Sequence, residues 1–155
     1  MLRNLGFKLT LSHQLKSNTL KEEKSIGIAP FAAFKSKMFP LDKMKIVTKL
    51  LAENGYKIFL FGGGKLEIDE LKTWENLNPN IQSLAGKISF EEELQKIATL
   101  QAMISMDSAN MHLASLMGTR TISIWGGTHP FAGFIGYGQS TNDVIQDETL
   151  NCRPT

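Results

Sequence analysis

The sequence predicts a three-layer, doubly wound α/β sandwich with a parallel β-sheet at its centre. Apolar runs of strand length alternate along the chain with longer segments of helical periodicity. Such alternation implies right-handed crossovers and a parallel sheet that is covered on both faces. The 155 residues, of which 42% are hydrophobic, suffice for one domain with a single core.

Five strands are expected to alternate with about four helices. In the first half of the chain these are a strand at 25–29, a helix at 41–54, a strand at 56–61, a helix at 66–76 and a strand at 81–84. Met44, Val47 and Leu51 follow helical spacing, and we expect Ile46 and Leu50 to widen their apolar stripe.

The second half of the chain is expected to hold a helix that begins at Ser89, a strand at 103–106, a helix at 108–117 and a strand at 121–125. Ser89 and Glu92 fit a capping box, in which the serine hydroxyl meets a free N–H group and the glutamate reaches back. Phe90, Leu94 and Ile97 continue one apolar face of that helix. The segment 126–138 is rich in glycine and aromatic residues and is interpreted as a functional loop.

Composition and charge exclude several classes of protein. The 17 basic and 15 acidic residues give a net charge of +2, which offers no overall electrostatic case for nucleic-acid binding. No apolar run approaches the roughly 18 residues that span a bilayer, and the first residues lack a signal-peptide core. The single cysteine, Cys152, cannot form an internal disulfide, which favours a reduced, cytoplasmic setting.

Metal and cofactor sites are not expected. His112 and His129 lack a third ligand, and no Asp-x-Asp pair marks a divalent-metal diphosphate site. Residues 1–24 fall outside the strand–helix alternation, so we interpret them as a linker and residues 25–155 as the folded domain.

The most informative motif runs from Asp107 to Leu113, where a polar Asp-Ser pair follows an apolar strand and opens a helix. Helix N-termini present free N–H groups and a partial positive charge, which suit a phosphate. Asp107 could instead serve as a simple N-cap. His112 lies one turn beyond Ser108, so both could face one cleft, although a helical histidine taken alone is more often a packed core residue.

A second motif follows the first expected strand. The small residues Ala32 and Ala33 allow backbone N–H groups to approach a ligand, and Lys37 could supply positive charge to a diphosphate. The alternative is a solvated loop lysine.

Two glycine-rich turns follow later strands. Gly62-Gly63-Gly64 is neither a Walker loop nor a dinucleotide fingerprint, but it lets a ligand approach the backbone, with Glu67 available to ribose hydroxyls. A plain strand-to-helix turn is the alternative. In Gly126-Gly127-Thr128, backbone N–H groups and the threonine hydroxyl could bind phosphate or sugar oxygens.

In this order and spacing, the motifs resemble glycosyltransferase family 9, the lipopolysaccharide heptosyltransferases. The resemblance covers about residues 25–138 and rests on Lys37-Met38-Phe39-Pro40, Gly62-Gly63, Gly86-Lys87-Ile88-Ser89, Asp107-Ser108-Ala109-Asn110-Met111-His112-Leu113 and Trp125-Gly126-Gly127-Thr128-His129-Pro130. The most specific part is Asp-Ser-Ala-x-x-His-Leu with the later Gly-x-Thr-x-Pro.

The resemblance implies the C-terminal, Rossmann-like half of a two-domain GT-B glycosyltransferase, which binds ADP-heptose. An N-terminal domain of the family binds the lipid A–core acceptor and supplies the catalytic base, so no catalytic residue is assigned to this chain. Residues 1–24 would be a remnant of the interdomain linker. The implied reaction is an inverting, metal-independent transfer of heptose to the inner core, and the chain is expected to be inactive in transfer without the acceptor domain.

The resemblance also assigns donor-binding roles. It places Ala32, Ala33 and Lys37 at the phosphates, Glu67 at the ribose, Ile88 against adenine, Asp107, Ser108, Ala109 and His112 at the diphosphate and heptose, and Thr128 beside the sugar. The implied location is cytoplasmic, with peripheral attachment to the inner membrane left open. A non-catalytic nucleotide-sugar-binding module or degenerate paralogue, and a nucleotide-sugar epimerase, stay open as alternatives.

Overall fold

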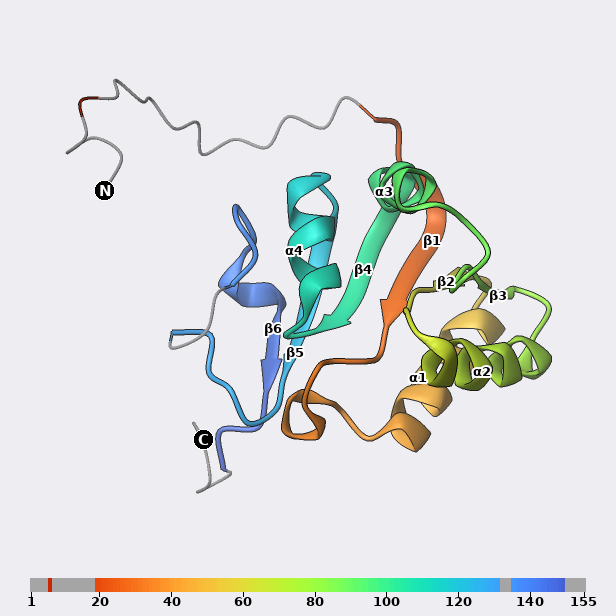
Figure 1. Ribbon diagram of the computed structural model, residues 1–155, viewed down its shortest axis with the longest axis horizontal. Coiled ribbons are helices and arrows are strands. Elements are labelled where there is room, and N and C mark those ends of the chain that lie inside the picture. The colour runs from red at the N-terminus through yellow and green to blue at the C-terminus, as the bar shows by residue number, and fades with distance from the viewer. Residues whose placement is uncertain (1–5, 7–18, 132–134, 150–155) are drawn as a thin grey trace.

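The computed structural model describes residue 6 and the ranges 19–131 and 135–149. Its centre is a six-stranded, all-parallel sheet with the strand order β3-β2-β1-β4-β5-β6 (Figure 1). The strands are β1 (Glu22–Ala29), β2 (Lys57–Leu60), β3 (Ile81–Ser83), β4 (Leu100–Met106), β5 (Arg120–Trp125) and β6 (Val144–Gln146). The predicted doubly wound, Rossmann-like α/β fold is therefore confirmed.

Four α-helices connect the strands: α1 (Leu41–Glu53), α2 (Lys65–Trp74), α3 (Phe90–Thr99) and α4 (Ala109–Leu116). Short 3-10 turns at Lys35–Lys37, Glu75–Leu77 and Thr141–Asp143 complete the fold. The capping box at the start of α3 is confirmed, since the Ser89 hydroxyl accepts from the Glu92 N–H and the Glu92 carboxylate accepts from the Ser89 N–H.

Two hydrophobic clusters cover the two faces of the sheet. One joins Ile28 and Leu60 to α1 and α2, and the other joins Phe59 and Met103 to α3 and α4. Figure 1 shows these two pairs of helices on opposite sides of the sheet. Successive strand residues point to opposite faces, so neighbouring Phe59 and Leu60 belong to different clusters. The layers therefore pack as helix, sheet and helix.

The order of the strands places a crevice beside the first strand. The chain winds outward from β1 through β2 to β3, then crosses back to β4 and winds the other way. Ligands of doubly wound sheets bind beyond the carboxyl ends of the strands at this reversal of direction. Here the reversal lies between β1 and β4.

Several sequence predictions need correction. β6 was not predicted, and β1 and β4 each begin three residues earlier than the expected strands at 25–29 and 103–106. Ile46, Leu50 and Phe90 are 58%, 52% and 62% exposed, so the predicted wide apolar faces of α1 and α3 are wrong at these positions. Each helix meets the sheet along a narrower stripe, because only one side of a surface helix reaches the core.

The first described residues pack onto the fold. The Lys21 ammonium donates to the Ala98 carbonyl at 2.7 Å and to the Thr119 hydroxyl at 3.0 Å, and Glu22 already belongs to β1. Most of the expected linker 1–24, residues 132–134 of the expected loop and Cys152 lie outside the described residues. Across the part of the chain that is described, no helix combines the length and apolar character needed to cross a membrane.

Candidate functional site

A pocket of about 450 Å³ opens at the carboxyl edge of the sheet, at the reversal of strand order between β1 and β4. Its walls come from the segments that follow β1, β2 and β4. The lining residues are Phe31, Ala32, Ala33, Lys37, Phe61, Gly62, Glu67, Asp107, Ser108, Ala109, Asn110 and His112. This volume lies in the range of pockets that hold small ligands.

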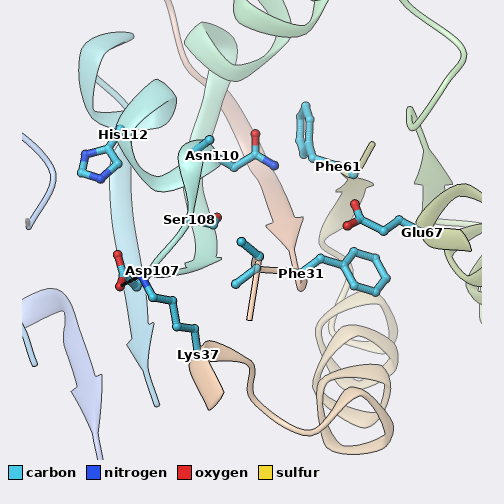
Figure 2. A pocket seen from close by; sticks show the side chains of 12 residues that line it. Phe31, Lys37, Phe61, Glu67, Asp107, Ser108, Asn110 and His112 are labelled. Atoms are coloured by element: carbon cyan, nitrogen blue, oxygen red, sulfur yellow. Dashed lines mark ion pairs between the residues drawn. The ribbon is translucent and has the colours of Figure 1, made fainter. Parts of the chain in front are cut away.

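An ion pair joins two of the walls. The Lys37 ammonium lies 2.8 Å from Oδ2 of Asp107, and the Thr128 hydroxyl donates to the same oxygen at 2.8 Å. The side chains of Lys37 and Asp107 are 27% and 10% exposed. Lys37 is therefore not the solvated loop lysine of the alternative interpretation, and Figure 2 shows it extending from its turn to Asp107.

The start of α4 forms the second part of the site. Ser108 is the N-cap residue, in extended conformation, and the helix itself begins at Ala109. Asp107 is therefore not the N-cap, which corrects the alternative interpretation of this residue. The Ser108 hydroxyl lies 3.2 Å from the hydroxyl of Ser105 rather than capping the helix.

The first backbone N–H groups of α4 have no partner within the helix, as at every helix N-terminus. Ala109 and Asn110, which carry two of these groups, line the pocket. His112, one turn further along, lines it too, and Figure 2 shows its ring on the side of Asp107. The pocket thus brings the positive end of a helix next to a lysine ammonium.

Glu67 forms the opposite wall. It lies in the first turn of α2, and its Oε2 accepts a hydrogen bond from the Gly63 N–H at 2.8 Å. A Cβ at Gly62 would lie 3.0 Å from Leu71 Cδ1 and 3.1 Å from Glu67 Oε2, so the backbone here passes close under the carboxylate. This turn fixes Glu67 toward the pocket.

The turn after β5 contacts two other parts of the site. The Gly127 N–H donates to the Ser36 carbonyl at 2.6 Å, and the Thr128 hydroxyl is held by Asp107. These groups were expected to bind phosphate or sugar oxygens. In the structure, the Gly127 N–H and the Thr128 hydroxyl contact the Lys35–Lys37 turn and Asp107, and the contact of Thr128 with the sugar stays a prediction.

Eight of the ten predicted site residues line the pocket: Ala32, Ala33, Lys37, Glu67, Asp107, Ser108, Ala109 and His112. Thr128 does not line the pocket, but its hydroxyl donates to Oδ2 of the lining residue Asp107. Ile88 is half-buried in the turn before α3 and does not line the pocket.

Sequence reasoning missed Phe31, Phe61 and Asn110 as lining residues, although it placed Gly62 near a ligand. Phe31 lies two residues after the end of β1, and Phe61 comes immediately after the end of β2. The signal that could have found them was position, since every residue just beyond a strand end of this sheet is a candidate.

The described residues contain no group of three or more His, Cys, Asp or Glu side chains that could hold a metal ion. Positive charge at the pocket comes from Lys37 and from the start of α4.

Comparison with known proteins places this site in context. Lipooligosaccharide heptosyltransferase 2 of Haemophilus influenzae is 32% identical over 116 residues, which are 72% of this chain and 34% of that protein. Lipopolysaccharide heptosyltransferase 2 of Escherichia coli is 28% identical over 114 residues, or 70% of this chain and 33% of that protein. The chain therefore spans about a third of the length of these relatives.

Solved structures share the fold. E. coli heptosyltransferase WaaC with ADP has a TM-score of 0.69 and 22% identity, over 79% of this chain and 38% of that chain. The glycosyl transferase family 9 protein of Veillonella parvula has a TM-score of 0.64 and 21% identity, over 90% of this chain and 38% of that chain. The model of glycosyltransferase family 9 (heptosyltransferase) matches residues 4–155. On this nearly complete match, the chain belongs to glycosyltransferase family 9, the heptosyltransferases.

Proposed function

We propose that this chain is the donor-binding part of a heptosyltransferase and that its pocket holds the nucleotide of ADP-heptose. One observation carries the proposal: Lys37, the start of α4 and Glu67 converge on one pocket at the reversal of strand order. These groups offer a cation, free N–H donors and a carboxylate, which are the partners that a diphosphate and a ribose require. The solved WaaC structure with ADP supports the same choice of nucleotide.

The diphosphate would lie between Lys37 and the start of α4. A lysine ammonium has three N–H donors, so Lys37 can keep Asp107 and still donate to phosphate oxygens. The backbone N–H groups of Ala109 and Asn110 would face the same oxygens. Ala32 and Ala33 leave space for the ligand to approach the backbone of the segment after β1.

Glu67 would bind the ribose through Oε1, since Oε2 accepts from the Gly63 N–H. Asp107 would bind the heptose through Oδ1, because Oδ2 accepts from both Lys37 and Thr128. His112 and Ser108 line the adjoining wall. The contacts of Ile88 with adenine and of Thr128 with the sugar stay predictions.

Inverting transfer needs an acceptor hydroxyl that attacks the anomeric carbon while ADP leaves with the bonding electron pair. The chain's groups would act on the leaving side, because Lys37 and the start of α4 stabilise the negative charge that develops on the departing diphosphate. A base must remove the proton of the attacking hydroxyl, and we assign no residue here to that role. The proposal is therefore donor binding by this chain and transfer only together with an acceptor-binding part of the family.

Calorimetric titration of the chain with ADP tests the binding, and incubation with ADP-heptose and a lipid A–core acceptor tests the transfer. We expect ADP to bind and to raise the melting temperature by mass action on the folded state, while no sugar is transferred. Absence of ADP binding would contradict the donor site. Robust transfer by this chain alone would contradict the assignment of the base to a part outside it.

A further inference from the structure

The turn after β5 touches the phosphate-side wall of the pocket without lining it. Gly126 lies under the Lys35–Lys37 turn so closely that a Cβ there would overlap the Ser36 carbonyl oxygen. That Cβ would also lie 3.2 Å from the Ser36 carbonyl carbon and 3.3 Å from that of Lys37. All three neighbours are backbone atoms, so a side chain at this position could be accommodated only if the turn moved.

Two hydrogen bonds fasten the same contact. The next residue, Gly127, donates its N–H to the Ser36 carbonyl at 2.6 Å. Thr128 then donates its hydroxyl to Oδ2 of Asp107, the atom that lies 2.8 Å from the Lys37 ammonium. Three consecutive residues thus hold both members of the Lys37–Asp107 pair, one through its backbone and the other through its side chain.

Among the described residues, core packing holds the two flanks of the Lys35–Lys37 turn, at Ala32 and Phe39, rather than the turn itself. None of its three residues is buried, and its own hydrogen bonds, from the Lys37 N–H to Phe34 and from the Met38 N–H to Lys35, are local. Beyond the turn, the Phe39 N–H lies 3.2 Å from the sulfur of Met106. The contact with Gly126 and Gly127 therefore fixes the middle of the turn, next to the point where Lys37 leaves the backbone.

We infer that Gly126, Gly127 and Thr128 are positioning residues, which set Lys37 and Asp107 for the diphosphate without contacting it. This inference rests on the proposed function, because it assumes that Lys37 binds phosphate. It explains two residues of the motif: Gly126 lies where a Cβ would overlap the Ser36 backbone, and Thr128 supplies the hydroxyl that donates to Asp107. If this turn bound phosphate or sugar directly, the loss of affinity from substituting it would add to the loss from Lys37→Ala.

Gly126→Ala tests the contact, with Ser36→Ala as the matched control because the Ser36 hydroxyl takes no part in it. We expect Gly126→Ala to weaken ADP binding roughly tenfold or more, up to the loss caused by Lys37→Ala, and Ser36→Ala to change it less than about twofold. Adenosine, which lacks phosphates, should bind both variants like the unaltered chain. Equal affinity of Gly126→Ala and the unaltered chain for ADP overturns the inference.

A double-mutant cycle separates positioning from general damage. If Gly126 acts through Lys37, then adding Gly126→Ala to Lys37→Ala should cost less than about a further twofold in ADP affinity. Fully additive losses overturn the inference, since they show a separate effect on the pocket. Thr128→Val provides a second variant without added bulk. Positioning predicts that it weakens ADP binding, whereas a contact of Thr128 with the transferred heptose alone predicts unchanged ADP binding, because ADP carries no heptose.

One further measurement judges the inference independently of ligand binding. In a crystal structure of Gly126→Ala, the Lys35–Lys37 turn should be displaced and the Lys37–Asp107 pair broken, while the pair in Ser36→Ala is retained. An intact pair in Gly126→Ala overturns the inference even if ADP does not bind. Failure of the unaltered chain to bind ADP, with the pair lost in Gly126→Ala, contradicts the proposed function and leaves the positioning role standing.

Discussion

The ammonium of Lys37 and the carboxylate of Asp107 form an ion pair of 2.8 Å across the two strands that flank the reversal of the sheet. Lys37 comes from the turn after β1, and Asp107 follows directly on β4. The pair closes one side of the pocket, and the Lys37 ammonium keeps further N–H donors for a ligand. It is the electrostatic centre of the proposed diphosphate site.

Lys37→Ala is expected to weaken ADP binding roughly 10- to 100-fold, because a charge-assisted hydrogen bond is worth about 1.5–3 kcal/mol and Asp107 would face the phosphates unpaired. Adenosine binding should hardly change. Lys35→Ala is the control, since Lys35 lies in the same turn but is exposed. Calorimetric titration with both ligands checks this, and equal losses for the two lysines would favour a generic basic loop.

Glu67→Ala is expected to weaken the binding of both ADP and adenosine, whereas Lys37→Ala should weaken that of ADP alone. A ribose contact is present in both ADP and adenosine, so the affinity for both should fall by roughly tenfold, the value of one hydrogen bond to a charged group. Asp69→Ala is the control, because Asp69 is an exposed acid of the same helix. A loss confined to ADP would place Glu67 at the phosphates or show that it acts on the pocket's overall charge.

ADP binding is expected to need no divalent metal. Among the residues that the structure describes, the pocket offers Asp107 and Glu67 on opposite walls, and no metal-binding group of three side chains forms. Titrations with Mg²⁺ and with a chelator should agree within roughly twofold in dissociation constant. A large loss of affinity in the chelator would contradict the assignment of charge neutralisation to Lys37 and α4.

Asp143→Asn is expected to lower stability at neutral pH. Arg120 donates to the Asp143 carboxylate through Nε and Nη2, and this hydrogen bonding holds the pKa of Asp143 below its usual value. The stabilisation is therefore present above the unfolded-state pKa of about 3.9 and is lost as the pH falls through the lower folded-state pKa. Urea unfolding at pH 7 and at pH 3 should show a difference between variant and unaltered chain that shrinks in acid.

The control for this pH dependence is Asp69→Asn, which alters an exposed acid and should leave the stability unchanged at both pH values. A difference between Asp143→Asn and the unaltered chain that stays constant with pH would show that the loss does not come from the ionised carboxylate.

The sequence contained enough information for the fold and for most of the pocket. The first five strands and the four helices between them followed from apolar spacing, and the capping pattern placed the start of α3 at Ser89. Residues after strand ends were sound candidates, because parallel strands bring their carboxyl ends to one edge. Lys37, Glu67 and Asp107 accordingly line one pocket.

What the sequence did not reveal depends on tertiary contacts. β6 has only three residues, Val144–Gln146, and is a strand because it pairs with β5. The Arg120–Asp143 ion pair links β5 to the residue just before β6. The contacts of Gly126 with Ser36 and of Thr128 with Asp107 could not be predicted, because nothing local to the motif indicates them. Ile88 lies in the turn before α3 and outside the pocket lining, which its position in the sequence alone does not show.

The most direct test of the central claim is an NMR titration of the ¹⁵N-labelled chain with ADP. Amide shifts should concentrate at Ala32, Ala33, Lys37, Gly62, Gly63 and the residues from Asp107 to His112, and they should saturate with a single dissociation constant. A second, apolar groove lies beside α1, β5 and β6 and is lined by Met44, Ile122 and Ile145 among others. Shifts centred on that groove, or no shifts at all, would contradict the assignment of the nucleotide to the pocket between β1 and β4.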